Sequence, residues 1–208
     1  LRAHVDPLPD GEFALTLTFH HAILDGWSLA SLTTEIVRRY AARLSGEPMP
    51  VDPPKVRYRD FVARTRAAVD DPHERAFWAG RVRDAVPTAL PAGPTGGDAL
   101  GTLTEVFPDA VVAGLDRAAR ALRVPLSTVL LAGHVRALAE ECAVDEVQTG
   151  LVMHGRPEQE GGVEVLGMYL NPLPLRVAAG TDRWSALVRR VHEAELDLLP
   201  HRLFPYAE

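Results

Sequence analysis

This sequence lacks the features that mark membrane-spanning and secreted proteins. No apolar run reaches the roughly 18–20 residues that a membrane-spanning helix needs. Cys142 is the only cysteine, so the chain cannot form an internal disulfide, and a reducing compartment suits it. No basic, apolar leader opens the chain, although its first residue is Leu1 rather than Met. We therefore expect a cytoplasmic protein with no membrane partner.

The sequence is also poor in the features of nucleic-acid and metal binding. Lys55 is the only lysine, and the formal net charge is −6 with no dense basic patch. Nucleic acid is therefore not expected as a main partner. Neither a His-Glu-x-x-His nor a Cys-x-x-Cys spacing occurs, so no metal site is predicted.

The hydrophobic periodicity that is present predicts alternating strands and helices. With 208 residues, of which 47% are hydrophobic and 24% charged, the chain can build a substantial core. Period-2 and period-3.6 patterns predict the elements. The predicted strands are 13–19, 102–107, 147–153 and 170–177, and the predicted helices are 27–44, 58–69, 74–82, 109–122, 129–142 and 184–199. This order is typical of an α/β layered architecture.

Proline and glycine mark the boundaries between these elements. Four prolines between Pro48 and Pro54 predict a stiff connector, and the segment from Pro87 to Gly101 predicts a linker. Asp109 and Ser127 are placed to cap the two helices that follow. The last predicted strand contains two prolines, which cannot donate ladder hydrogen bonds, so it should be an edge or crossover strand.

The segment from His20 to Gly26, His-His-Ala-Ile-Leu-Asp-Gly, is the candidate chemical centre. It lies where a predicted strand ends and a helix begins. A neutral imidazole can accept a proton on one nitrogen and donate from the other, depending on its hydrogen bonds. Asp25 can fix the turn by accepting backbone amides or by pairing with an arginine. Local chemistry alone leaves a catalytic histidine and a buried histidine beside an ordinary helix cap both open.

His-His-x-x-x-Asp-Gly followed by Trp27-Ser28 resembles the signature of nonribosomal peptide synthetase condensation domains, which share the chloramphenicol-acetyltransferase-like fold. Other segments resemble that family's pattern in the right order. They are Tyr58-Arg59-Asp60-Phe61, Phe77-Trp78, Gly155-Arg156-Pro157, Leu166 to Arg176, and His201-Arg202-Leu203-Phe204-Pro205-Tyr206. The matches run across nearly the whole chain.

The resemblance implies an α/β fold: a two-lobe chloramphenicol-acetyltransferase-like αβ sandwich. Residues 1–84 would be the end of an N-terminal lobe that carries the motif, 85–101 a linker, and 102–208 part of a C-terminal lobe. A complete condensation domain looks about twice as long as this chain. We therefore expect the sequence to be truncated at both ends.

The resemblance also implies roles for the motif residues. His21 corresponds to the active-site histidine, which would accept the amine proton, position the amine or stabilise the tetrahedral intermediate. His20 would support the site. Asp25 would hold the loop through an arginine, and Gly26 would leave backbone room for the substrate.

Two residues outside the motif are also candidates for the site. Asn171 lies on a motif segment and is given a site role, whereas Arg156 is expected to be structural. Tyr58 and Trp78 are better explained by helix packing. The sequence departs from the family pattern at Pro172, where threonine is usual, and this departure bears on the geometry near Asn171.

The implied reaction is attack by an aminoacyl amine on an acyl or peptidyl thioester. Both substrates would arrive on phosphopantetheine arms of acyl- and peptidyl-carrier domains, with an adenylation domain adjacent and no cofactor or metal bound by the domain itself. An epimerisation domain and a cyclising domain fit the motif less well. A free-standing acyltransferase and an inert, partner-recruiting relative remain alternatives.

Overall fold

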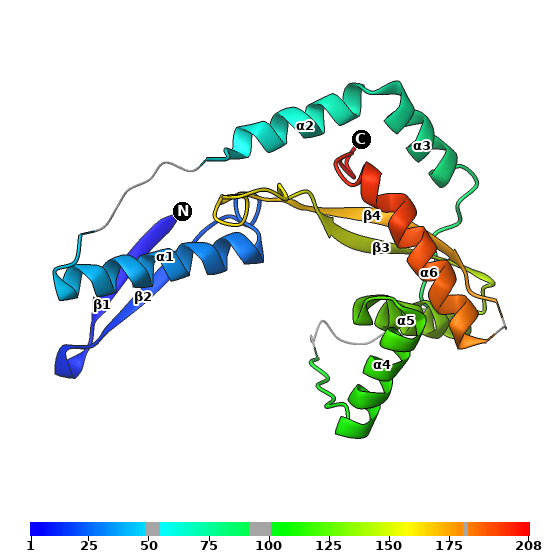
Figure 1. Cartoon of the computed structure of the whole chain (residues 1–208), viewed down its shortest axis with the longest axis horizontal. Coiled ribbons are helices and arrows are strands. Elements are labelled where there is room, and N and C mark those ends of the chain that lie inside the picture. The colour runs from blue at the N-terminus through cyan, green and yellow to red at the C-terminus, as the bar shows by residue number, and fades with distance from the viewer. Residues whose placement is uncertain (49–54, 92–100, 181–182) are drawn as a thin grey trace. The chain divides into compact units, whose positions relative to one another are not determined.

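The computed structural model describes most of the chain (Figure 1). The described residues are 1–48, 55–91, 101–180 and 183–208. They form two compact units. Unit 1 comprises Leu1–Asp70, Met153–Asn171 and Leu203–Glu208, and unit 2 comprises Asp71–Val152 and Pro172–Arg202. No helix in the described ranges is both long and apolar enough to cross a bilayer. The predicted lobe boundaries at 84 and 102 stay a prediction.

Unit 1 begins with a β-hairpin that leads into the histidine motif. Strands β1 (Arg2–Pro7) and β2 (Phe13–Thr18) pair antiparallel, with Arg2 opposite Thr18 and Pro7 opposite Phe13. The short 3₁₀ turn η1 (Pro9–Gly11) connects them. The alternation of residues predicted β2 correctly. It missed β1, which offers only two apolar side chains and is exposed along its whole length.

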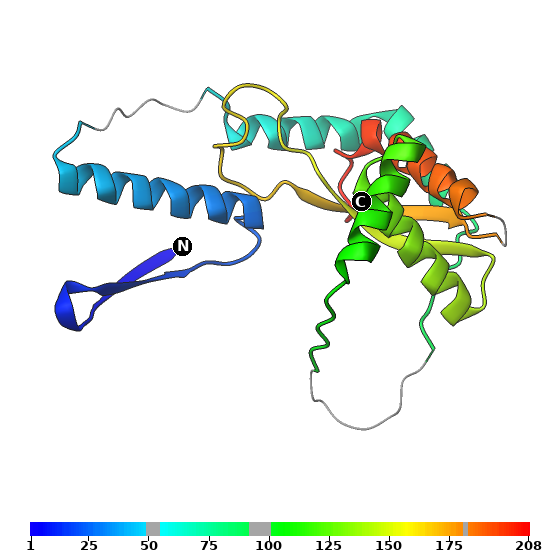
Figure 2. The same ribbon diagram turned by 60° about the horizontal axis from the view of Figure 1, so that its bottom comes forward.

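Helix α1 (Gly26–Ser45) follows the motif, as its periodicity predicted. It runs beside the hairpin in both views (Figures 1 and 2), and the rings of Phe13 and Tyr40 meet edge to face at 5.3 Å. The helix ends at Gly46, whose φ of 72° lies in the left-handed region that glycine adopts without strain. The end of α1 is therefore set by local sequence.

Helix α2 (Tyr58–Asp70) anchors the core of unit 1. Phe61 on its inner face is buried with Val56, Val165 and Tyr169. The rings of Phe61 and Tyr169 lie 4.8 Å apart, within the range of a favourable aromatic pair. This cluster joins α2 to the segment that follows Arg156.

Unit 2 is built on helices packed over a strand pair. Its helices are α3 (Pro72–Val82), α4 (Asp109–Leu122), α5 (Leu126–Cys142), α6 (Trp184–Leu198) and the 3₁₀ turn η2 (Leu199–His201). Helix α5 contacts both α4 and α6. Val135 on α5 and Leu187 and Val191 on α6 are fully buried. These side chains form the centre of the unit's core.

Strands β3 (Glu146–His154) and β4 (Leu170–Ala178) form a two-stranded sheet. On β4, Leu173, Leu175 and Val177 are buried, whereas Pro172 and Pro174 occupy the alternate positions. Within the described residues β4 pairs only with β3. The expectation that its prolines make it an edge or crossover strand stays a prediction.

Three predictions about local structure were wrong. Thr102 to Phe107 forms neither strand nor helix, and its apolar side chains are exposed. Asp109 and Ser127 do not cap helices. With Asp109 as cap, α4 would begin one residue later than it does, and with Ser127 as cap, α5 would begin two residues later; the cap positions are instead Pro108 and Pro125. Much of the two predicted connectors, at 49–54 and 92–100, lies outside the described residues.

The buried side of α6 can be tested with a matched pair of leucines. Leu187 is 0% exposed and Leu196 is 54% exposed. Replacing a buried leucine with alanine costs about 2–5 kcal/mol because it leaves a cavity. Leu187→Ala should therefore speed hydrogen exchange of the α6 amides, measured by mass spectrometry on the complete protein that the gene encodes. Leu196→Ala should leave the exchange unchanged, and equal effects of the two variants would contradict this packing.

Candidate functional site

The histidine pair lies in a tight turn between β2 and α1. The turn is closed by a hydrogen bond from the Ile23 amide to the His20 carbonyl, 3.1 Å. The His20 imidazole also serves the turn, since its Nδ1 accepts the Ala22 amide at 3.1 Å. This bond fixes the orientation of the His20 ring. His20 therefore stabilises the turn itself, and its supporting role at the site stays a prediction.

His21 is presented differently from its neighbour. Its side chain is exposed, and its ring lies 6.3 Å from that of Phe19, centroid to centroid. Within the described residues neither ring nitrogen of His21 has a hydrogen-bond partner in the protein. The imidazole therefore keeps both nitrogens available for a group that approaches from outside.

Asp25 is the buried anchor of the motif, with only 2% of its surface exposed. Its carboxylate accepts the Ser28 amide at 2.7 Å, which caps α1, and the Tyr169 amide at 3.2 Å. Its own amide donates to the Gly167 carbonyl at 3.0 Å. Asp25 thereby ties the start of α1 to a segment more than 140 residues further along the chain.

Arg156 pairs with Asp25, for which the resemblance implied an arginine partner without naming the residue. Its Nη2 lies 3.1 and 3.2 Å from the two carboxylate oxygens, and the side chain is 7% exposed. Nη1 donates to the carbonyls of Val165, 2.6 Å, and Gly162, 3.3 Å. The guanidinium also lies 4.1 Å from the centroid of the Tyr169 ring, within cation–π range. The guanidinium charge is therefore balanced by the Asp25 carboxylate, two backbone carbonyls and an aromatic ring.

The environment of Asp25 favours its ionised form. Burial alone would raise the pKa of the carboxyl, but the hydrogen bonds from Ser28 and Tyr169 and the charge of Arg156 outweigh it and lower the pKa. Burial raises the pKa of Tyr169, and Arg156 opposes that shift. The site therefore combines a carboxylate, a guanidinium and a neutral phenol.

Sequence reasoning gave too little weight to two residues around the Asp25–Arg156 pair. Ser28 is fully buried, and its hydroxyl bonds to Arg156 and Gly167. The Tyr58 hydroxyl donates to the Met168 carbonyl at 2.9 Å, so Tyr58 does more than pack a helix. Ser28 directly follows the motif and Tyr58 opens a resembling segment. Those positions were the only signals that could have indicated them.

The side chain of Asn171 bonds to residues near the end of the chain. Its Nδ2 donates to the Phe204 carbonyl at 2.5 Å, and its Oδ1 accepts the Tyr206 amide at 3.0 Å. Asn171 thereby clamps the last residues of the chain. This arrangement gives it a structural task, and a direct role at the site stays a prediction.

Gly26 is the first residue of α1 and its φ is not positive. A Cβ placed there would have no described atom within 4 Å. A conformational requirement for glycine is therefore not seen here. The open space beside Gly26 is compatible with the predicted room for substrate, which stays a prediction.

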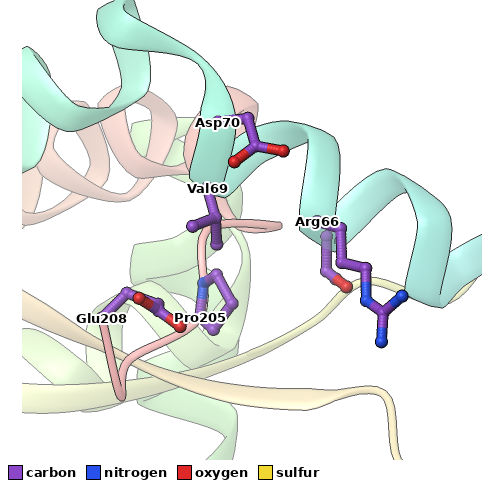
Figure 3. A pocket seen from close by; sticks show the side chains of 6 residues that line it. Arg66, Val69, Asp70, Pro205 and Glu208 are labelled. Atoms are coloured by element: carbon purple, nitrogen blue, oxygen red, sulfur yellow. The ribbon is translucent and has the colours of Figure 1, made fainter.

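A separate surface pocket lies where the end of α2 meets the last residues of the chain (Figure 3). It is lined by Thr65, Arg66, Val69, Asp70, Pro205 and Glu208. None of these belongs to the predicted site. Among the described residues, no group of three or more His, Cys, Asp or Glu side chains is arranged to hold a metal ion.

Comparisons with known proteins match this chain along its length. A family model described as "Condensation domain" matches residues 1–208. The AMB antimetabolite synthetase AmbE of Pseudomonas aeruginosa is 37% identical over 202 residues, which are 96% of this chain and 10% of that protein. A dimodular nonribosomal peptide synthase of Bacillus subtilis is 30% identical over 222 residues, 99% of this chain and 9% of that protein.

A solved condensation-domain structure has the same fold as this chain. The first condensation domain of the calcium-dependent antibiotic synthetase, in complex with substrate analogue 2a, aligns with a TM-score of 0.75 at 26% identity. The match covers 98% of this chain and 48% of that one. The chain therefore spans a tenth or less of these curated relatives and about half of the solved domain.

The buried ion pair predicts a large cost for Asp25→Asn. Asparagine keeps the shape but leaves the Arg156 guanidinium buried without a counter-charge, which should destabilise the fold by about 3–5 kcal/mol. Urea unfolding of the complete protein, followed by tryptophan fluorescence, measures this. Asp60→Asn is the control, because that carboxylate is exposed and lies 3.9 Å from Arg59. A loss no larger than that of Asp60→Asn would show that the pair is not a structural anchor.

The lowered pKa of Asp25 predicts how this contribution depends on pH. A carboxyl whose folded pKa lies below its ordinary value of 3.8 stabilises the fold above that value. The contribution is lost as pH falls through the lower, folded-state pKa. The stability gap between wild type and Asp25→Asn should thus be constant near neutrality and shrink below about pH 4. A gap that widens on acidification would refute this sign.

Proposed function

Because this chain belongs to the condensation-domain family, we propose that it forms an amide bond between two substrates that carrier domains deliver. The family's fold class, predicted from the sequence as chloramphenicol-acetyltransferase-like, is confirmed by the solved condensation domain. The curated relatives are named as a synthetase and a peptide synthase. Both are far longer than this chain. Because such synthetases contain several domains, we propose carrier and adenylation domains as the partners of this chain.

The observation that carries the proposal is the contrast between His21 and Asp25. The imidazole is exposed with both nitrogens unpaired among the described residues, whereas the carboxylate four residues later is buried and bonded on every side. Asp25 therefore holds the turn in place, while the His21 imidazole on the same turn faces solvent. A general base needs this combination of access and restraint.

In the proposed reaction, the amine nitrogen of the acceptor attacks the thioester carbonyl of the donor. His21 accepts the proton that the amine loses, the new carbon–nitrogen bond forms, and the carbon–sulfur bond breaks. The proton then passes to the departing sulfur, which leaves as the thiol of a phosphopantetheine arm. No metal or nucleotide is required for these steps.

Most of the rate gain would come from bringing two tethered substrates together. Orienting reactants in one site can lower a barrier by about 7–11 kcal/mol. A positioned base contributes the smaller share, about 10²–10⁴-fold in rate. His21 would therefore improve a reaction that the bound geometry already favours.

The proposal is tested by supplying the complete protein with carriers loaded with a model acyl or peptidyl donor and an aminoacyl acceptor. Amide product on the acceptor carrier is followed by mass spectrometry. Product that forms only on a free small amine or alcohol, and not on the carrier, would instead identify a free-standing acyltransferase. No product with any acceptor would reject the activity.

His21→Ala should lower the rate of amide formation by about 10²-fold or more, because the acid–base contribution is removed. The turn should survive, since the bonds that close it come from His20 and Ile23. His73→Ala, at an exposed histidine on α3, is the matched control and should leave the rate unchanged. A normal rate in His21→Ala would reject the catalytic assignment.

A further inference from the structure

The hydroxyl group of Ser28 makes three of the hydrogen bonds that join the loop after Arg156 to the start of α1. Ser28 Oγ donates to the Gly167 carbonyl at 2.8 Å and accepts the Gly167 amide at 3.0 Å. It also accepts Arg156 Nη2 at 2.9 Å. One fully buried side chain thus satisfies both backbone groups of a residue that lies 139 positions away.

Gly167 is confined on its other side by Tyr58. A Cβ on Gly167 would lie 2.2 Å from Cδ2 of the Tyr58 ring, far inside van der Waals contact. The Tyr58 hydroxyl then bonds the next carbonyl, that of Met168, at 2.9 Å. The loop therefore passes between the start of α1 and the Tyr58 ring, and glycine alone fits the passage.

These contacts act on the base of the turn that carries His21. The Asp25 amide donates to the same Gly167 carbonyl that Ser28 binds, so both ends of the first helical turn are attached to one loop residue. If the Ser28 hydroxyl is removed, the Gly167 amide and one hydrogen of Arg156 lose their acceptor at a site closed to water. The loop can regain those bonds only by shifting relative to α1.

We infer that Ser28 is a positioning residue for the proposed reaction: its hydroxyl clasps Gly167 and Arg156 and so fixes the placement of the His21 turn. This inference rests on the proposed function. Ser28 does not touch the substrate. It acts through the loop backbone, and a displacement of about 1 Å at a reacting group can cost up to 10²-fold in rate.

The test compares Ser28→Ala with Ser31→Ala in the complete protein. Ser31 is on the same helix and donates to the same loop, at Val163, but through an exposed bond of 3.3 Å. Ser28→Ala should lower kcat for amide formation by about 10- to 10²-fold while KM for the loaded carriers stays near the wild-type value. Ser31→Ala should leave both constants unchanged.

Hydrogen exchange tests the clasp without using activity. Peptides that contain Gly167 and Tyr169 should exchange faster in Ser28→Ala than in wild type, and peptides from α5 should not change. Unchanged exchange at Gly167 would overturn the clasp, and faster exchange with a normal kcat would overturn the positioning role. A wild-type protein that forms no amide would reject the proposed function, while the exchange data would still decide whether the clasp exists.

Discussion

A buried ion pair between Asp25 and Arg156 is the constraint on which unit 1 depends. Removing two charges from water costs several kcal/mol for each ion, and attraction alone rarely repays that cost. Here the pair is supported by backbone amides on the carboxylate side, and by two carbonyls and the Tyr169 ring on the guanidinium side. The pair fixes the end of the histidine turn against a loop from the far part of the chain.

The adjacent histidines divide their tasks because of this restraint. His20 Nδ1 accepts a hydrogen bond from the backbone of its own turn. His21 is exposed and makes no hydrogen bond to the described part of the protein. A flexible turn would let the imidazole sample many directions at an entropic cost in the reaction. An anchored turn makes the direction of one imidazole a property of the fold.

The sequence predicted the elements that depend on local pattern and missed contacts that depend on the distant chain. Helix α1 and strands β2 and β4 follow from periodicity, and the resemblance identified Asp25 and anticipated an arginine partner. Thr102 to Phe107 alternates like a strand, yet its apolar residues are exposed and no described strand pairs with it. No local pattern could show that Ser28 reaches Gly167, because that contact exists only after the chain has folded.

In the proposed reaction His21 contacts the acceptor amine. This contact can be observed in a crystal structure of the complete protein with a non-reactive acceptor analogue that bears its amine on a pantetheine arm. We expect the amine nitrogen within about 2.6–3.2 Å of a ring nitrogen of His21, with Asp25 and Arg156 still paired. An amine bound elsewhere, with the His21 ring turned away from it, would show that His21 does not act on the amine.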